Sequence, residues 1–257
     1  MILLDFGAML DESFAYAKEC VWERWKRWLL LMVSLIVFPL ILGYMVKIFR
    51  GDRPAPDPAE WGSLFINGLK LLLVQILYFL PVILLAILAF VPMISALIAA
   101  GALSEDFSGM SDSQTERWLS SHPELLSAAG TMVVLLLLAI ILAIIIPVFS
   151  FIGVVRFART ESIGEAFHFS AILARIGRIG WINYIIALLV ITVIGFIFGM
   201  LLNMISFIPK VGDAVRLIAM IVLYVPFLLF SARYCALVYD EGEEKILPAA
   251  EGTVAPR

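Results

Sequence analysis

The stretch from Ser162 to Met200 reads SIGEAFHFSAILARIGRIGWINYIIALLVITVIGFIFGM and joins two kinds of helix. Ser162 and Glu165 have the spacing of a capping box, which predicts that a helix begins there. Arg175 and Arg178 lie off the apolar face of this helix. That face is made by residues recurring at helical spacing, namely Phe169, Ile172, Leu173, Ile176 and Ile179. A short amphipathic helix with arginines and few other charges is typical of the plane of a membrane interface.

The second half of the stretch has the composition of a membrane-spanning helix. No residue from Ile179 to Pro209 is charged, and Trp181 lies where the uncharged run begins. About 20 apolar residues suffice to cross a bilayer. Gly195 and Gly199 form a Gly-x-x-x-Gly pair, which allows helices to approach closely in lipid. We interpret the pair as a helix-packing site, used either within the chain, which we favour, or between copies of it.

The composition of the whole chain excludes several classes of protein. Of its 257 residues 63% are hydrophobic and 15% are charged, and the mean hydropathy is +1.04. Soluble domains are about half apolar and about a quarter charged, so lipid is the natural solvent for the excess apolar surface. A net charge of −3 without a dense basic cluster argues against a nucleic-acid partner. Two distant cysteines predict neither a disulfide framework nor a zinc site.

The chain is predicted to form one polytopic membrane domain over residues 1–239, followed by a disordered acidic tail, 240–257. Residues 1–27 form an amphipathic region whose tryptophans and basic residues are typical of an interface anchor. Arg233 interrupts the last hydrophobic segment near its end, where we expect it to snorkel to the interface. The hydrophobic segments cover about 28–46, 71–103, 125–155, 180–208 and 214–238.

We therefore predict an all-α membrane protein, a helical bundle of four transmembrane helices with amphipathic interfacial helices. The first hydrophobic segment either spans the membrane or re-enters near Pro39. Basic residues in short loops stay in the cytoplasm, and residues 47–70 and 156–178 are much richer in them than residues 105–124. The two basic connections and the C-terminus are thus expected on the cytoplasmic side of the cell membrane. A re-entrant first segment, which we favour, keeps the basic N-terminal region there as well.

Few residues in the interiors of the spans carry reactive groups: Gln75, Asn203 and some serines and threonines occur there, and no carboxylate, lysine or histidine does. The candidate interfacial residues are Arg156, Arg159, Glu165, His168, Arg175 and Arg178. They fit a lipid-headgroup or phosphate site, or the solvated face of an amphipathic helix, which we favour. The sequence has no Gly-rich phosphate loop, metal-ligand spacing or Ser/His/Asp set. We therefore expect no catalytic, metal or cofactor-binding residues, and no enzyme.

Two blocks of sequence resemble a known family. Residues 44–51 read YMVKIFRG and residues 56–70 read PDPAEWGSLFINGLK; the second block contains GEAFHF at 164–169 and GWINY at 180–184. The chain resembles, over roughly residues 28–239, an uncharacterised and mainly archaeal family of multi-pass membrane proteins, domain of unknown function 4013. The resemblance implies the membrane architecture and no particular activity.

For function, the sequence predicts an integral membrane protein whose activity it does not reveal. We favour a non-enzymatic scaffold or interaction protein that grips the inner leaflet and recruits a protein partner through residues 240–257. The alternative is a transporter or lipid-handling protein with a cavity between helices kinked at Pro81, Pro92 and Pro147. Membrane lipids, a protein partner at the tail and further copies of the chain are the expected partners, and nucleic acid is not.

Overall fold

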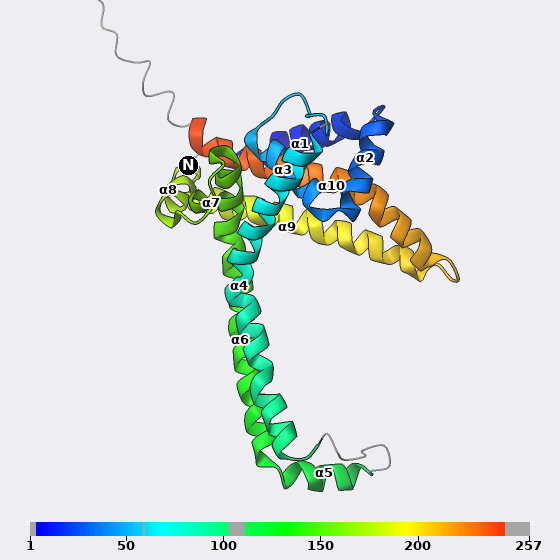
Figure 1. Ribbon diagram of the computed structural model, residues 1–257, viewed down its shortest axis with the longest axis vertical. Helices are drawn as coiled ribbons and strands as arrows, with labels where there is room; N and C mark the ends of the chain where they lie inside the picture. The colour runs from blue at the N-terminus through cyan, green and yellow to red at the C-terminus, as the bar shows by residue number, and fades with distance from the viewer. Residues whose placement is uncertain (1–3, 59, 103–110, 245–257) are drawn as a thin grey trace, which may run out of the picture. The chain divides into compact units, whose positions relative to one another are not determined.

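The computed structural model describes residues 4–58, 60–102 and 111–244, and within these ranges it contains helices and no strand. The all-α prediction is therefore confirmed for this part of the chain (Figure 1). The helices are, in chain order, α1 Phe6–Val21, α2 Trp25–Ile36, α3 Phe38–Arg50, α4 Trp61–Ala99, α5 Asp112–Ser120, α6 Pro123–Thr160, α7 Ile163–Ala166, α8 Phe169–Ile179, α9 Trp181–Met204, the short 3-10 helix η2 Ile205–Phe207, and α10 Gly212–Glu244.

Four helical runs are long and apolar enough to cross a membrane, as the sequence predicts. The 39 residues of α4 reach about 58 Å at 1.5 Å per residue, roughly twice the ~30 Å thickness of a hydrocarbon layer. Pro81 and Pro92 lie inside α4, which continues through both. A helix this long must tilt or extend beyond the layer. The runs are Trp61–Ala99, Pro123–Thr160, Trp181–Phe207 and Gly212–Gly242.

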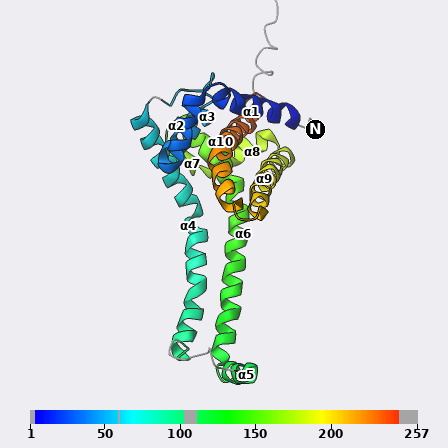
Figure 2. The ribbon, with the colours of Figure 1, turned by 90° about the vertical axis from the view of Figure 1, so that its right-hand side faces the viewer.

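The chain packs as two compact units. The larger unit comprises Met1–Gln75 and Val148–Arg257, and the smaller unit comprises Ile76–Pro147. In the smaller unit the adjoining parts of α4 and α6 run antiparallel and are joined through α5 (Figure 2). Their ends meet in a small apolar cluster of buried residues, Ala96, Leu125 and Ala128. The candidate sites described below lie in the larger unit.

The first hydrophobic segment folds as two short helices that break at Val37. Pro39 occupies the first turn of α3. N–H groups in this turn have no partner within the helix, so a proline there costs no helical hydrogen bond. The 12 residues of α2 and the 13 residues of α3 each reach only about 18–20 Å, too short for a ~30 Å layer. On either side of the segment, Glu12 pairs with Arg53. The segment thus doubles back, a geometry that favours the re-entrant alternative over a straight span.

Helix α1 packs on α10 through one face, as Figure 2 shows. Tyr16 and Cys20 are on this buried face, and the Tyr16 hydroxyl also donates to the carbonyl of Asp52 at 3.3 Å. Arg233 of α10 is buried beneath α1, where it pairs with Glu12 at 2.6 Å and lies over the Tyr16 ring. Helix α1 thus supplies a carboxylate that satisfies Arg233 within the chain, and the place of Arg233 at the membrane interface stays a prediction.

Helices α3 and α4 cross in backbone contact at two glycines. A Cβ at Gly43 would overlap the backbone of Leu64, and a Cβ at Gly68 would overlap the backbone of Pro39 and Gly43. No other residue type leaves room for this crossing. The contact holds the doubled-back segment against the beginning of the first long helix.

Two local predictions are only partly right. A helix, α7, begins directly after Ser162 as predicted, but the Ser162 side chain makes no capping hydrogen bond and α7 ends after four residues. A separate helix, α8, begins at Phe169. The predicted tail begins too early at residue 240, because α10 continues to Glu244; residues 245–257 lie outside the described part of the chain.

Candidate functional site

Arginines and carboxylates gather where the C-terminal ends of α3 and α6 meet the last turns of α10. Arg50 donates from Nε to the carbonyl of Ala158 at 3.1 Å, and Arg159 donates from Nε to the carbonyl of Phe49 at 2.7 Å. The last carbonyls of a helix lack partners and carry partial negative charge, so a guanidinium satisfies both needs. We call this group the arginine layer; it consists of Arg50, Arg53, Arg156, Arg159, Arg175 and Arg233.

Arg159 links three helices from the centre of the layer. Besides Phe49, its guanidinium pairs with Asp240 of α10 at 2.7 Å. Gly51 ends α3 with φ +94°, and a Cβ on it would lie 3.2 Å from the Arg159 guanidinium. Glycine therefore serves both the left-handed turn and the approach of the arginine.

The Glu165 carboxylate binds Arg156 of the arginine layer and does not cap α7, the helix on which it lies. Arg156 donates to it from Nε at 2.8 Å, and His168 Nδ1 lies 3.5 Å from the same carboxylate oxygen. The hydrogen bond from Arg156 lowers the pKa of the Glu165 carboxyl below its usual value. On the other side of α6's end, Glu161 pairs with Arg50 at 3.2 Å.

Arg175 is buried between α8 and α10. It donates to the Tyr239 hydroxyl at 3.2 Å, and its guanidinium carbon lies 4.1 Å from the centre of that ring, a cation–π distance. Gly242 permits this packing, since a Cβ there would be 2.6 Å from Arg175 Cδ. The buried face of α8 thus includes Arg175, while Phe169 and Leu173, predicted on the same face as Ile172, are exposed.

The six residues predicted as an interfacial site therefore do not form one site. Arg156, Glu165 and His168 form one cluster. Arg159 and Arg175 both lie over the Tyr239 ring of α10, at 5.8 Å and 4.1 Å, and Arg159 also pairs with Asp240, while Arg178 is exposed on α8. These contacts hold helices together, and a lipid-headgroup or phosphate site at the six residues stays a prediction.

Among the described residues, the Gly-x-x-x-Gly pair makes no close helix approach. A Cβ at Gly195 would touch Phe227 at 3.6 Å, an ordinary contact, and one at Gly199 would meet nothing within 4 Å. Phe227 already stacks on Phe198 at 4.3 Å, which keeps α9 and α10 apart at this level. Use of the pair between copies of the chain stays a prediction.

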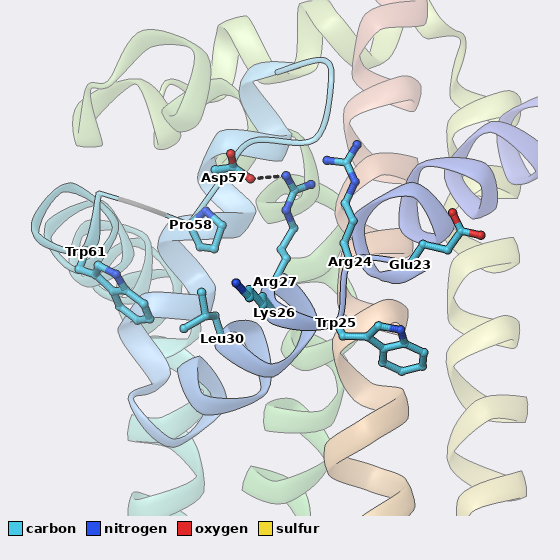
Figure 3. A pocket seen from close by; sticks show the side chains of 9 residues that line it. All are labelled: Glu23, Arg24, Trp25, Lys26, Arg27, Leu30, Asp57, Pro58 and Trp61. Carbon is cyan, nitrogen blue, oxygen red and sulfur yellow. Dashed lines mark hydrogen bonds and ion pairs between the residues drawn. The ribbon is translucent and has the colours of Figure 1, made fainter.

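A pocket of about 710 Å³ opens between the first turns of α2 and α4. Figure 3 shows Trp61 and Pro58 facing Lys26 and Leu30, with the Glu23 carboxylate on the side away from Lys26. We call this the basic pocket; its lining residues also include Arg24, Trp25, Arg27 and Asp57. Sequence reasoning identified residues 1–27 only as an interface anchor, although the run Arg24-Trp25-Lys26-Arg27 was the available signal.

An apolar groove of about 620 Å³ lies between α2 and α10. Its walls carry no charged side chain, and Tyr224 is its most polar lining residue. The other lining residues are Leu29, Met32, Val33, Leu35, Ile36, Phe38, Met220 and Ile221.

In the described ranges, no three His, Cys, Asp or Glu side chains come close enough to hold a metal ion. The long apolar helices and the arginine layer that ties their ends define a multi-pass helical membrane protein. The chain belongs to the family described as "Protein of unknown function (DUF4013)", whose family model matches residues 28–207. A search of the curated proteins and a search of the solved structures each found no match.

Proposed function

We propose that the protein is a non-enzymatic membrane scaffold. In this proposal the arginine layer holds the helix ends together, and the spanning helices contact lipid or other proteins. The observation that carries the proposal is the low burial of the spans. Only 6–11% of the most apolar window of each spanning helix is buried. A helix that lined a substrate pathway would bury one face against its neighbours, whereas these helices leave their apolar faces available for contacts outside the chain.

The arginine layer supports the same proposal from the polar side. Ion pairs and arginine–carbonyl hydrogen bonds join α1, α3, α6 and α10, and the Arg175 contact adds α8. Because these ion pairs and hydrogen bonds connect several helices, the arginine layer holds the helix ends in one arrangement. On this proposal α1 and α8 lie at the cytoplasmic surface, and the C-terminal tail recruits a protein partner from there.

The test of recruitment is a truncation at a boundary that the structure defines. Removing residues 245–257 leaves α10 and the Asp240–Arg159 pair intact, whereas a cut before residue 240 would shorten α10 by its last five residues and remove the Asp240–Arg159 pair. Full-length and truncated proteins are purified in parallel, and co-purifying proteins are quantified by mass spectrometry. We expect at least one partner to be lost with the tail while the thermal unfolding midpoint is unchanged. Identical partner sets would contradict recruitment through the tail.

A second candidate function, lipid handling, is favoured by the apolar groove. Its wall on α10 belongs to a spanning helix, so the fitting occupant is the acyl chain of a membrane lipid. Val33→Trp would fill the groove, and Ile87→Trp on the exposed face of α4 is the control. Native mass spectrometry should show less co-purified lipid in the Val33 variant alone. Equal lipid in both variants would count against this function.

A further inference from the structure

The basic pocket differs from the arginine layer because two of its cationic side chains have no carboxylate partner among the described residues. Arg27 is buried, pairs with Asp57 and donates to the carbonyl of Ala55 at 3.2 Å, so its charge is neutralised within the chain. Lys26 and Arg24 are exposed, and among the described residues neither makes an ion pair or hydrogen bond through its side chain. Two cations are thus left at a concave surface.

The backbone adds to the positive potential of the pocket. Trp25 begins α2 and Trp61 begins α4, so the N-terminal ends of two helices border the same space. Neither first turn contains an acidic residue, and no side chain caps α2. Free N–H groups and the helix dipole favour an anion at such a position. The pocket therefore combines two unneutralised side chains with two helix ends of the same sign.

The walls indicate what kind of molecule carries the anion. Trp25 and Trp61 are 63% and 37% exposed, and indoles of this kind prefer the headgroup level of a membrane. Leu30, at the floor, is 40% exposed and leads to the apolar surface of α2, where Ile36 is 84% exposed. A ligand with a phosphate at the basic end and hydrocarbon along α2 would match both surfaces.

We propose that the basic pocket binds a phosphate group, carried by an anionic membrane lipid or supplied as free phosphate, through Lys26 and Arg24 with the helix ends of α2 and α4. Arg27 lies at the wall of the pocket, where it pairs with Asp57. This site goes beyond the scaffold function, because it would give the protein a preference among lipids whether or not the tail recruits a partner.

The test compares three probes on the full-length protein in neutral detergent: dioctanoyl phosphatidic acid, dioctanoyl phosphatidylcholine and inorganic phosphate. Binding is measured by native mass spectrometry. Each cation near a membrane surface contributes about fivefold in affinity for an anionic lipid. We expect phosphatidic acid to bind at least tenfold tighter than phosphatidylcholine, and Arg24→Gln/Lys26→Gln to remove about tenfold or more of that affinity.

The matched control is Lys18→Gln/Lys210→Gln, which removes two exposed charges, one from α1 and one from the turn before α10, outside the pocket. It should change the affinity less than twofold. Saturable binding of inorganic phosphate that is lost in the pocket variant would support the anion site and assign it to free phosphate. Equal binding of the two lipids, or equal losses in pocket and control variants, would overturn the proposal. If the double variant fails to fold, the single substitutions at Arg24 and Lys26 carry the test.

Discussion

Arg50 and Arg159 each bind a carbonyl at the end of the other's helix. Arg50, the last residue of α3, donates to Ala158 of α6, and Arg159 of α6 donates to Phe49 of α3. The exchange joins two helix ends that are 108–110 positions apart in sequence. Because each guanidinium meets the negative end of the partner helix, the two contacts reinforce one another.

Substituting Arg159 with lysine should therefore weaken the larger unit although the charge is kept. Lysine cannot present the planar fork that reaches Phe49 and Asp240 together. Hydrogen bonds to charged groups contribute about 1.5–3 kcal/mol each, so we expect Arg159→Lys to lower the free energy of unfolding by about 2 kcal/mol. Thermal unfolding in detergent measures this. Arg117→Lys, at an exposed position of α5, is the control, and equal midpoints for the two variants would contradict the prediction.

The crossing of α3 and α4 predicts opposite results for two glycines of one helix. Gly68→Ala would push a methyl group into the backbone of Pro39, and overpacking of this kind lowers the free energy of unfolding by about 1–3 kcal/mol or more. Gly62→Ala has nothing within 4 Å and gains helix propensity, so it should be neutral or stabilising by up to ~1 kcal/mol. Chemical unfolding monitored by tryptophan fluorescence distinguishes the two. A tolerated alanine at position 68 would show that the helices do not cross as described.

Glu165 predicts a pH dependence of stability. Its pKa is lowered from 4.5, chiefly by the hydrogen bond from Arg156, so the folded state holds the ionised carboxylate more strongly than the unfolded state does. The contribution to stability is present above pH 4.5 and is lost as the pH falls through the lower folded value. Glu165→Gln should remove this loss, so its unfolding midpoint should fall less between about pH 5 and pH 3, while Glu116→Gln should behave as the parent protein. Parallel curves for the parent and the Glu165 variant would contradict the assignment.

The spans could be predicted from the sequence because a long uncharged apolar segment is compatible with few structures other than a membrane-spanning helix. Residues 180–208 are an example. The partners of the polar residues could not. Asp240 lies 81 positions from Arg159, and no local pattern connects them. The capping-box spacing of Ser162 and Glu165 was misleading because a guanidinium competes for the carboxylate. Gly195 and Gly199 looked like the packing site, whereas Gly43 and Gly68, in no recognisable pair, make the close approach.

The doubled-back first segment predicts which residues share a side of the membrane. Since Glu12 contacts Arg53 across this segment, cysteines introduced at the exposed positions 14 and 53 should react from one side. Glu116 in α5 lies between two spanning helices and should react, once replaced by cysteine, from the other side. Native Cys20 gives little background, because burial raises its thiol pKa to about 11 and hides it from reagent.

Labelling uses a membrane-impermeant maleimide on sealed, right-side-out vesicles, in a background with Cys235 replaced by alanine. We expect positions 14 and 53 to react only after the vesicles are opened, and position 116 to react in sealed vesicles, since basic connections stay in the cytoplasm. The substitution Arg178→Cys on α8 should follow positions 14 and 53, because the arginine layer joins α8 to the ends of α3 and α10. Opposite reactivity at positions 14 and 53 would mean that the first segment crosses the membrane, and the Glu12–Arg53 pair could not then exist.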